Sequence, residues 1–185
     1  AMLSRGHAQR VAVADLNELK SHLDTLTSAQ AVTWGVTKDD AVEVCTQADT
    51  EAQQAGAIAR TRENFKFRAA PGVMMLDHDG LPDGALSPLQ FRDQLIAAAP
   101  ALANAPMLWR PSASAGCVDP DGGVLSGLTR HRLYIPVADA TLIPEAGTAL
   151  ETLLWATPGA GWCDISVAGQ SLPRCLVDVS VWQPE

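Results

Sequence analysis

The spacing of apolar residues divides the first part of the chain into short helices and strands. Between residues 12 and 30, apolar positions recur at steps of three and four residues, which predicts an amphipathic helix. Short apolar runs predict strands at 31–36 and 41–45, and residues 51–58 follow a helical pattern. We expect these elements to form an N-terminal α/β unit over residues 1–70.

A second series of elements follows Pro71. Helix 88–99 has the clearest start, because Ser87, Pro88 and Gln90 stand where an N-cap, a first helical residue and a capping box place them. The expected elements are, in order, a strand at 73–76, this helix, strands at 106–111 and 130–137, a helix at 144–155, and strands at 162–167 and 175–182. This βαββαβ order with one further strand predicts an α+β fold with a ferredoxin-like or RNA-recognition-like palm over 71–185, on which the N-terminal unit packs.

Length and composition narrow the class of protein. With 185 residues, 47% of them hydrophobic, the chain can bury the core of one compact domain. No apolar run is long enough to cross a membrane and no signal sequence is apparent, so we expect a cytoplasmic protein without a membrane partner. The net charge of −8 argues against a protein that coats nucleic acid by charge alone, but a site made of carboxylates is compatible with it.

The sequence Leu76-Asp77-His78-Asp79-Gly80 is the strongest chemical signal. Side chains two residues apart in a strand point to the same face, so Asp77 and Asp79 are expected to lie side by side. Two such carboxylates repel each other unless a cation joins them, and Mg²⁺ or Mn²⁺ prefers oxygen ligands that it shares with phosphates. The pattern indicates phosphoryl or nucleotidyl transfer, and the alternative is a turn that the two aspartates cap.

A third carboxylate, Asp178, lies in the apolar segment 175–182. A charge inside such a strand needs a partner or a cation, so Asp178 is expected either to complete a metal site with Asp77 and Asp79 or to pair with Arg174.

The strand 130–137 carries the candidate phosphate ligands. Alternation places Arg130, Arg132 and Tyr134 on one face and His131 on the other. If that face also carries the aspartates, the arginines can bind triphosphate oxygens. Ser112 and Ser114, in the preceding small-residue loop, can donate hydrogen bonds to phosphate or shape a turn.

These motifs, in this order, resemble the archaeo-eukaryotic primase superfamily. The matching features are the hydrophobic D-x-D, the loop Arg110-Pro111-Ser112-Ala113-Ser114, the histidine and tyrosine of strand 130–137, and the late Asp178. The similarity covers residues 60–185 and is greatest to the primase-polymerase domains of plasmids, phages and integrated elements. It departs from the family at the second motif, because Arg132 stands where the family has a histidine and His131 comes one residue earlier.

The resemblance implies a DNA primase or primase-polymerase. Asp77, Asp79 and Asp178 would hold Mg²⁺ or Mn²⁺, and nucleotide triphosphates and a single-stranded DNA template would be the substrates. The nucleotide would be bound by a set of polar residues: Ser112, Ser114, His131, Arg132 and Arg174. The template would follow a set of basic residues: Arg60, Arg62, Lys66, Arg68, Arg110 and Arg130, with Phe65 or Phe67 stacked on bases. As in such proteins, a helicase or other replication domain is expected after the C-terminal end of this chain.

Two other functions fit the same residues. A haloacid-dehalogenase-like phosphatase would use Asp77 as nucleophile and Asp79 as general acid, although no lysine follows Lys66 in the chain. A nucleic-acid-binding module without catalysis could use the same scaffold. Binding of metal and nucleotide separates these functions, because a primase needs both and a passive module needs neither.

Overall fold

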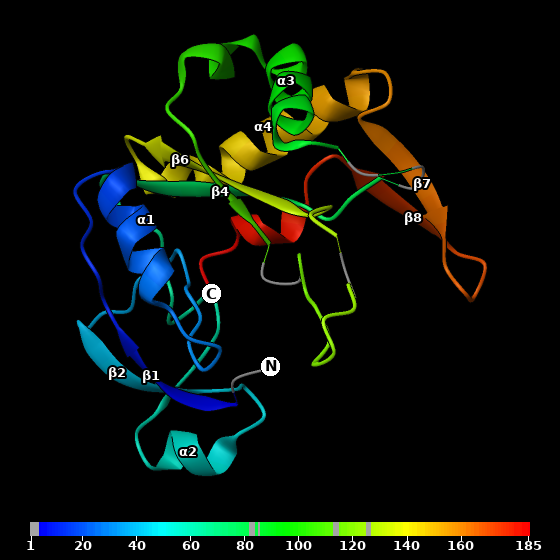
Figure 1. Cartoon of the computed structure of the whole chain (residues 1–185). Helices are drawn as coiled ribbons and strands as arrows, with labels where there is room; N and C mark the ends of the chain where they lie inside the picture. Colours follow the sequence, from blue (N-terminus) through cyan, green and yellow to red (C-terminus); the bar gives the residue numbers. More distant parts are fainter. Residues whose placement is uncertain (1–3, 82–83, 85, 113–114, 125–126) are drawn as a thin grey trace. The chain divides into compact units, whose positions relative to one another are not determined.

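A computed structural model of the chain describes residues 4–81, 84, 86–112, 115–124 and 127–185. These residues form four α-helices and eight strands in three small sheets, which establishes a mixed α+β class (Figure 1). The chain divides into two compact units. The first contains residues 1–73, 137–141 and 183–185, and the second contains residues 74–136 and 142–182. Within the described ranges, no helix is both long and apolar enough to span a membrane.

The first unit is built around a three-stranded sheet with the order β1-β2-β3. Strand β1 (Arg5–Gln9) pairs antiparallel with β2 (Ala41–Cys45), and β3 (Ile58–Ala59) is parallel to β2. Two helices complete the unit, α1 (Leu16–Thr25) and α2 (Thr50–Gln54).

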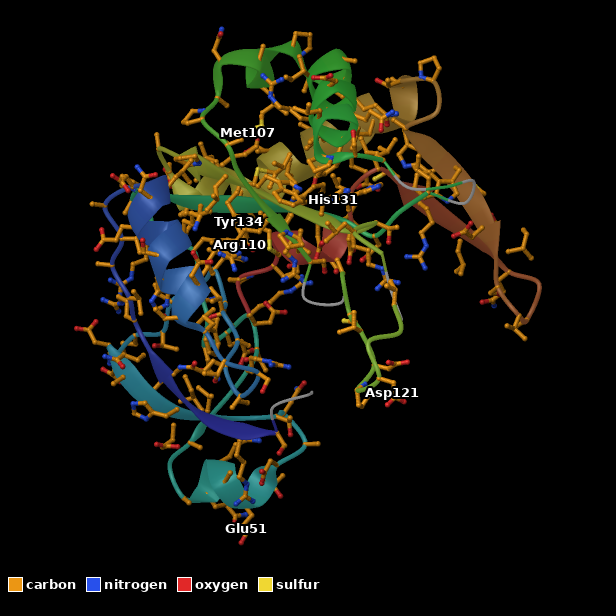
Figure 2. All side chains as sticks on the ribbon, in the orientation of Figure 1. Glu51, Met107, Arg110, Asp121, His131 and Tyr134 are labelled. Carbon is orange, nitrogen blue, oxygen red and sulfur yellow. The ribbon has the colours of Figure 1, made fainter. Side chains whose placement is uncertain are left out.

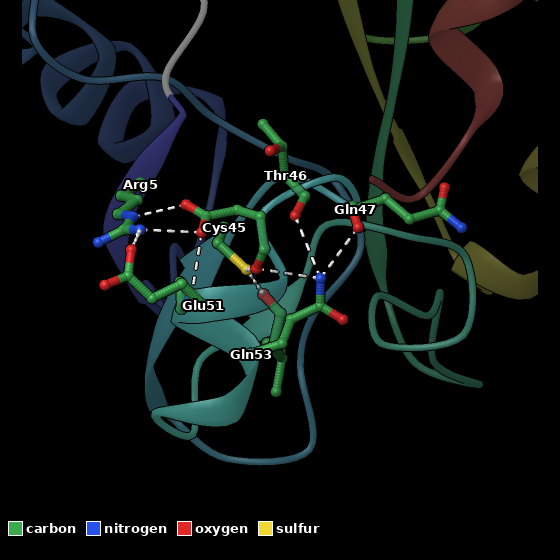
Figure 3. A network of polar contacts seen from close by, with 9 residues as sticks. Arg5, Cys45, Thr46, Gln47, Glu51 and Gln53 are labelled. Carbon is green, nitrogen blue, oxygen red and sulfur yellow. Dashed lines mark hydrogen bonds and ion pairs between the residues drawn. The ribbon is translucent and has the colours of Figure 1, made fainter.

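Polar contacts fix the start of α2 to the sheet (Figure 3). Arg5 Nη2 donates to Asp49 Oδ1 at 2.9 Å and to Glu51 Oε2 at 2.9 Å, and Asp49 caps the helix by accepting from Ala52 N. The Arg5 guanidinium holds the pKa of Asp49 below its ordinary value. Gln53 Nε2 donates to the carbonyl oxygen of Gln47 at 3.0 Å, so the helix is also tied to the loop before it.

The second unit contains most of a sheet with the order β4-β6-β5. Its strands are β4 (Gly72–His78), β5 (Leu108–Pro111) and β6 (His131–Val137), and β5 is antiparallel to β6. Helix α3 (Pro88–Ala98) leads from β4 toward β5, and α4 (Ile143–Ala156) follows β6. The two helices pack against each other (Figure 1).

The remaining elements of this unit are a hairpin and short 3-10 turns. Strand β7 (Gly161–Ile165) pairs antiparallel with β8 (Ser171–Cys175), with Trp162 opposite Arg174. The 3-10 turns are η1 (Pro100–Asn104), η2 (Ala140–Leu142), at the junction of the two units, and η3 (Val179–Trp182).

The core of the second unit lies between α3 and the sheet. Phe91 and Leu95 of α3, Leu76 of β4 and Leu154 of α4 are completely buried. Helix α3 begins as the sequence predicts, because Ser87 and Gln90 form both hydrogen bonds of a capping box. The predicted strands at 41–45, 73–76, 106–111, 130–137 and 162–167 and the helix at 144–155 are likewise confirmed, with ends that shift by at most two residues.

Two predicted elements of the first unit are shorter than expected. The helix predicted at 12–30 is limited to α1, because Asp15 caps its start by accepting from the backbone of Asn17 and Glu18. The helix predicted at 51–58 ends at Gln54, since Gly56 takes a positive φ of 100° that turns the chain toward β3.

Two predicted strands are wrong. Residues 31–36 form no ladder: Val36 makes an isolated bridge with Lys66, and Gly35 N donates to Pro184 O at 2.8 Å. Residues 175–182 are not a strand either, since β8 ends at Cys175 and η3 follows. Strand β1 was not predicted, because its pairing with β2 bridges residues that are distant in the sequence.

Candidate functional site

The two faces of the sheet carry different chemistry. His78 and His131 stack at a ring distance of 6.0 Å, and His78 also stacks on Phe91 of α3, so both histidines face the helices. Asp77 and Arg132, next to them in β4 and β6, point to the opposite face. The predicted alternation in strand 130–137 is confirmed, and the face with Arg132 is the face with Asp77.

Asp77 is the buried centre of this polar face. Asp77 is 7% exposed, and its Oδ2 accepts a hydrogen bond from Arg132 Nε at 3.0 Å. The other oxygen, Oδ1, is buried and has no hydrogen-bond partner among the residues that the structure describes. Burial raises the pKa of Asp77 above its ordinary value, against the opposing effect of Arg132, and the nearby charges of Asp79 and Asp178 raise it further. Such a carboxylate is stabilised by any additional cation.

Strand β5 extends the polar face. Arg110 lies directly opposite Arg132 in the antiparallel register, and Leu108 lies opposite Tyr134. Tyr134 is buried near both arginines and Asp77, and burial raises the pKa of its phenol. Figure 2 labels Arg110 on β5 and Tyr134 and His131 on β6 (Figure 2).

Asp178 lies beside Asp77, although the two are far apart in the sequence. Asp178 N donates to Asp77 O at 2.7 Å, which places the C-terminal segment along β4. The Asp178 carboxylate accepts from Ser180 N at 2.9 Å and from Ser180 Oγ at 2.8 Å. This turn explains why the predicted strand 175–182 does not form: the aspartate bonds the backbone two residues onward instead of a neighbouring strand.

The suggested pairing of Asp178 with Arg174 is not observed. Arg174 Nε instead lies 3.7 Å from Asp164 Oδ2, across the β7–β8 hairpin.

Asp79 follows the end of β4 and is exposed. Together with Asp178 it lines a cleft of about 410 Å³ in the second unit. The remaining residues of this cleft come from the end of β4, α4, the hairpin and the segment after it: Gly80, Leu81, Arg130, Glu151, Trp155, Trp162, Asp164, Pro173, Arg174, Cys175, Val177 and Val179. The volume lies in the range of small-molecule binding sites.

No metal centre is assembled in the described part of the chain. Among these residues, no three His, Cys, Asp or Glu side chains come close enough to hold an ion together. The cause is visible at two of the three predicted ligands: one oxygen of Asp77 is bound to Arg132, and Asp178 is turned toward Ser180. The buried, unpartnered Oδ1 of Asp77 is the feature that a cation would satisfy.

His131 does not reach this cleft. It is fully buried, and its Nε2 lies 2.6 Å from the carbonyl oxygen of Leu86, with Trp109 at a ring distance of 5.8 Å. The structure therefore places Arg132, and not His131, on the Asp77 face. Ser112 is buried and donates its backbone N–H to Arg130 O at 3.0 Å, while Ser114 lies outside the described residues.

The predicted template residues divide between the two units. Arg60, Arg62, Lys66 and Arg68 belong to the first unit, and Arg110 and Arg130 belong to the second. The segment 60–68 is a loop, and two of its arginines hold it to other parts of the first unit. Arg62 pairs with Glu185 at 3.4 Å, and Arg68 donates to Thr37 O at 3.3 Å. Phe65 is 3% exposed, so it cannot stack on bases.

Sequence reasoning missed the aromatic part of the cleft. Trp155 is 41% exposed at the C-terminal end of α4, and Trp162 is half-buried in β7. A tryptophan on the exposed side of a predicted helix is the signal that could have drawn attention to Trp155. Glu151, one helical turn earlier, lines the same cleft.

Comparisons with protein-family models, curated proteins and solved structures found no significant match to this chain.

Proposed function

We propose that the chain is a metal-dependent nucleotidyltransferase that makes or extends primers on a single-stranded nucleic-acid template. The observation that carries this proposal is the hydrogen bond from Asp178 N to Asp77 O, at 2.7 Å. It joins the two carboxylate motifs that the sequence analysis assigned to one site, and Asp79 lines the same cleft as Asp178.

The arrangement of strands supports the proposal. Strand β6 lies between β4 and β5, so the two strands connected through α3 are separated by a third. This split order, with a second helix after β6, is the one used in ferredoxin-like palms. The segment around Asp178 lies beside β4, where a βαββαβ palm has its last strand, and supplies one backbone hydrogen bond there.

Three carboxylates support a divalent cation of the Mg²⁺ or Mn²⁺ type by their chemistry, although the described residues do not assemble them into a metal centre. Asp77 Oδ1 is buried and lacks a partner, and Asp79 and Asp178 supply further carboxylates beside it. All three are hard oxygen ligands, as these ions require. A bound ion of this class would neutralise triphosphate oxygens and lower the pKa of an attacking 3′-hydroxyl.

The basic residues then take distinct roles. Arg132 already neutralises Asp77 and, with 31% of its side chain exposed, can also reach a phosphate on the open side. Arg110 is directly opposite Arg132 on β5, so the two guanidinium groups can bind neighbouring phosphate oxygens. Arg130 and Arg174 line the cleft beside the carboxylates. The basic loop 60–68 of the first unit is proposed to contact the template backbone.

The geometry favours this function over a phosphatase. The aspartyl nucleophile would have to be Asp77, which is bound to Arg132 and does not line the cleft, whereas a metal ion can also be held by Asp79 and Asp178, which do line it. The second unit also lacks any lysine to neutralise the phosphate.

The test is incorporation of labelled nucleotides on a single-stranded template, with and without a primer, in Mg²⁺ or Mn²⁺. We expect metal-dependent product from the native chain, none from the Asp77→Ala/Asp79→Ala variant, and undiminished product from Asp93→Ala. Asp93 is a matched control because it is an exposed carboxylate of α3 outside the cleft. A folded native chain without product contradicts the proposal; binding without turnover would then indicate a passive module, and metal-dependent hydrolysis of a phosphate monoester would indicate a phosphatase.

A further inference from the structure

The aromatic half of the cleft has no role in the chemistry proposed so far. Trp155 comes from α4 and Trp162 from β7, the first strand of the hairpin drawn in orange in Figure 1 (Figure 1). Both line the same cleft as Asp79 and Asp178. An aromatic wall beside a carboxylate cluster indicates a ligand with an apolar planar part and a polar part.

Trp155 packs closely against Gly161 of the hairpin. A Cβ atom at Gly161 would lie 2.8 Å from Trp155 Cε3 and 2.9 Å from Cδ2, so the six-membered ring packs directly on the glycine backbone. No other residue at position 161 permits this contact without a shift. The residue is nevertheless 41% exposed and lines the cleft, so part of its surface is available to a ligand there. A ring that is fixed by packing and partly exposed is a preorganised stacking surface.

The second tryptophan, Trp162, has an arginine of strand β8 as its neighbour. Trp162 lies directly opposite Arg174 in the β7–β8 register, and Arg174 is oriented by Asp164 at 3.7 Å. Arg174, Trp155 and Trp162 therefore line one cleft, with Arg174 and Trp162 on the same face of the hairpin. Guanidinium and indole groups are the side chains on which bases stack without sequence preference.

The charge of the cleft selects a neutral planar group. Asp79 and Asp178 are the carboxylates proposed to hold the metal. The remaining charged residues of the cleft are two acidic and two basic: Glu151, Asp164, Arg130 and Arg174. With formal charges balanced there, neither a strongly anionic nor a cationic ligand is favoured, whereas an uncharged heterocycle is.

We propose that Trp155, fixed on Gly161, is a stacking platform for a nucleobase. The phosphates of the same ligand would lie at the metal ion proposed to bind Asp79 and Asp178. This inference rests on the proposed function for the identity of the ligand, but its binding test needs neither metal nor turnover. The base belongs either to a free nucleotide or to a nucleic-acid strand, and the chemistry of stacking is the same for both.

The experiment follows the indole N–H signals of the native chain by NMR while adenosine, which carries the base without a charged phosphate, is added in the presence of EDTA. The chain has five tryptophans, and substitution of each one assigns its signal. We expect the signals of Trp155 and Trp162 to shift with a base ligand and those of Trp34, Trp109 and Trp182 to remain. Trp155 and Trp162 signals that stay unchanged both with adenosine and with the oligonucleotide described next overturn the proposal, as does a response to choline chloride without a response to either.

A single-stranded oligodeoxyadenosine, which carries the same base, is added in a parallel titration and distinguishes the two sources of the base. Shifts with adenosine assign the platform to a free nucleotide, and shifts with the oligonucleotide alone assign it to a strand. Trp155→Leu should weaken the binding that is observed about tenfold, Trp155→Phe should retain most of it, and Leu153→Ala should leave it unchanged. Leu153 is a matched control because it is exposed on the same helix and does not line the cleft. Equal binding by Trp155→Leu and the native chain overturns the platform.

Failure of this proposal and failure of the proposed function give different results. If Trp155 binds a base but no nucleotide is incorporated, base stacking on Trp155 is supported and the proposed nucleotidyltransferase activity is contradicted. If incorporation depends on Asp77 and Asp79 while the indole signals stay unchanged, the activity is supported and base stacking on Trp155 is contradicted.

Discussion

Arg132 Nε donates to Asp77 Oδ2 at 3.0 Å, on the face of the sheet that α3 does not cover. This pair links β4 to β6 through side chains, and it occupies one oxygen of the carboxylate that the sequence marks most clearly as a metal ligand. Arg132 is thus both the counter-ion of Asp77 and the cation nearest to any phosphate bound there.

Removal of Arg132 should destabilise the second unit. In Arg132→Met, the carboxylate of Asp77 stays buried without a counter-ion, and we expect a loss of about 1–3 kcal/mol in the free energy of unfolding at pH 7. Urea denaturation measures it. The matched control is Arg174→Met, whose ion pair with Asp164 is half-exposed and should cost less than about 0.5 kcal/mol. Equal losses of unfolding free energy in the two variants would show that the Arg132–Asp77 pair stabilises the fold no more than an exposed ion pair does.

The raised pKa of Asp77 predicts an unusual pH dependence. Because the folded state binds the proton more tightly than the unfolded chain, where the ordinary pKa is 3.8, ionisation of Asp77 removes stability as the pH rises above about 4. Asp77→Asn cannot ionise, so its stability relative to the native chain should improve between pH 3.5 and pH 6. Urea unfolding at several pH values follows this difference, and a difference that is constant or declines with pH is incompatible with the prediction.

His78 should act in the opposite direction, at higher pH. Burial lowers its pKa below the ordinary 6.5, so the folded chain holds His78 neutral while the unfolded chain takes up a proton. Stability attributable to His78 is complete above pH 6.5 and declines as the pH falls below that value. The native chain should therefore lose more stability between pH 7 and pH 5 than His78→Asn, which keeps a donor for Leu176 O. Parallel pH profiles of the two chains would contradict this.

The same histidine shows how Asp178 is held in place. His78 Nδ1 lies 2.8 Å from Leu176 O, so the buried face of β4 fixes the segment that carries Asp178. Trp182 anchors its other end against Gly147 of α4, where an added Cβ would lie 2.3 Å from the indole ring. The contacts of His78 and Trp182 thus set the position of Asp178, which is one of the predicted metal ligands.

The contact at Gly147 gives a packing prediction. Alanine is the better helix former by about 1 kcal/mol, yet Gly147→Ala should destabilise the chain by about 1–3 kcal/mol because the methyl group collides with Trp182. Thr148→Ala, at the next and exposed position of α4, should be close to neutral. Thermal or urea unfolding of both variants checks the result. A stabilised Gly147→Ala variant would mean that Trp182 does not pack on this helix.

Local signals were sufficient to predict part of this fold. Helix α3 was predictable because its cap, first proline and capping-box glutamine are neighbours in the sequence, and β4 because its apolar run is continuous. The alternation in β6 was sufficient to place Arg132 opposite to His131 across the sheet.

The remaining features depend on contacts between distant residues. The segment 175–182 has the composition of a strand, but the side chain of Asp178 satisfies the backbone of Ser180 and bends the chain. The cleft brings together α4, the hairpin and the end of β4, so no local pattern could reveal that Trp155 and Trp162 stand beside the aspartates. The partners of Asp77 were equally hidden, since only the folded sheet shows which arginine faces it.

Binding of a divalent cation tests the central claim most directly, because every step of the proposed chemistry requires it. Calorimetric titration of the native chain with Mn²⁺ should show one or two ions bound per chain. Asp79→Asn and Asp178→Asn should each weaken binding at least about tenfold, since each removes a charged ligand, whereas Asp93→Asn should bind as the native chain does. A native chain that binds no Mn²⁺, or an Asp79→Asn variant that binds it equally well, would contradict the assignment of these carboxylates to a metal site.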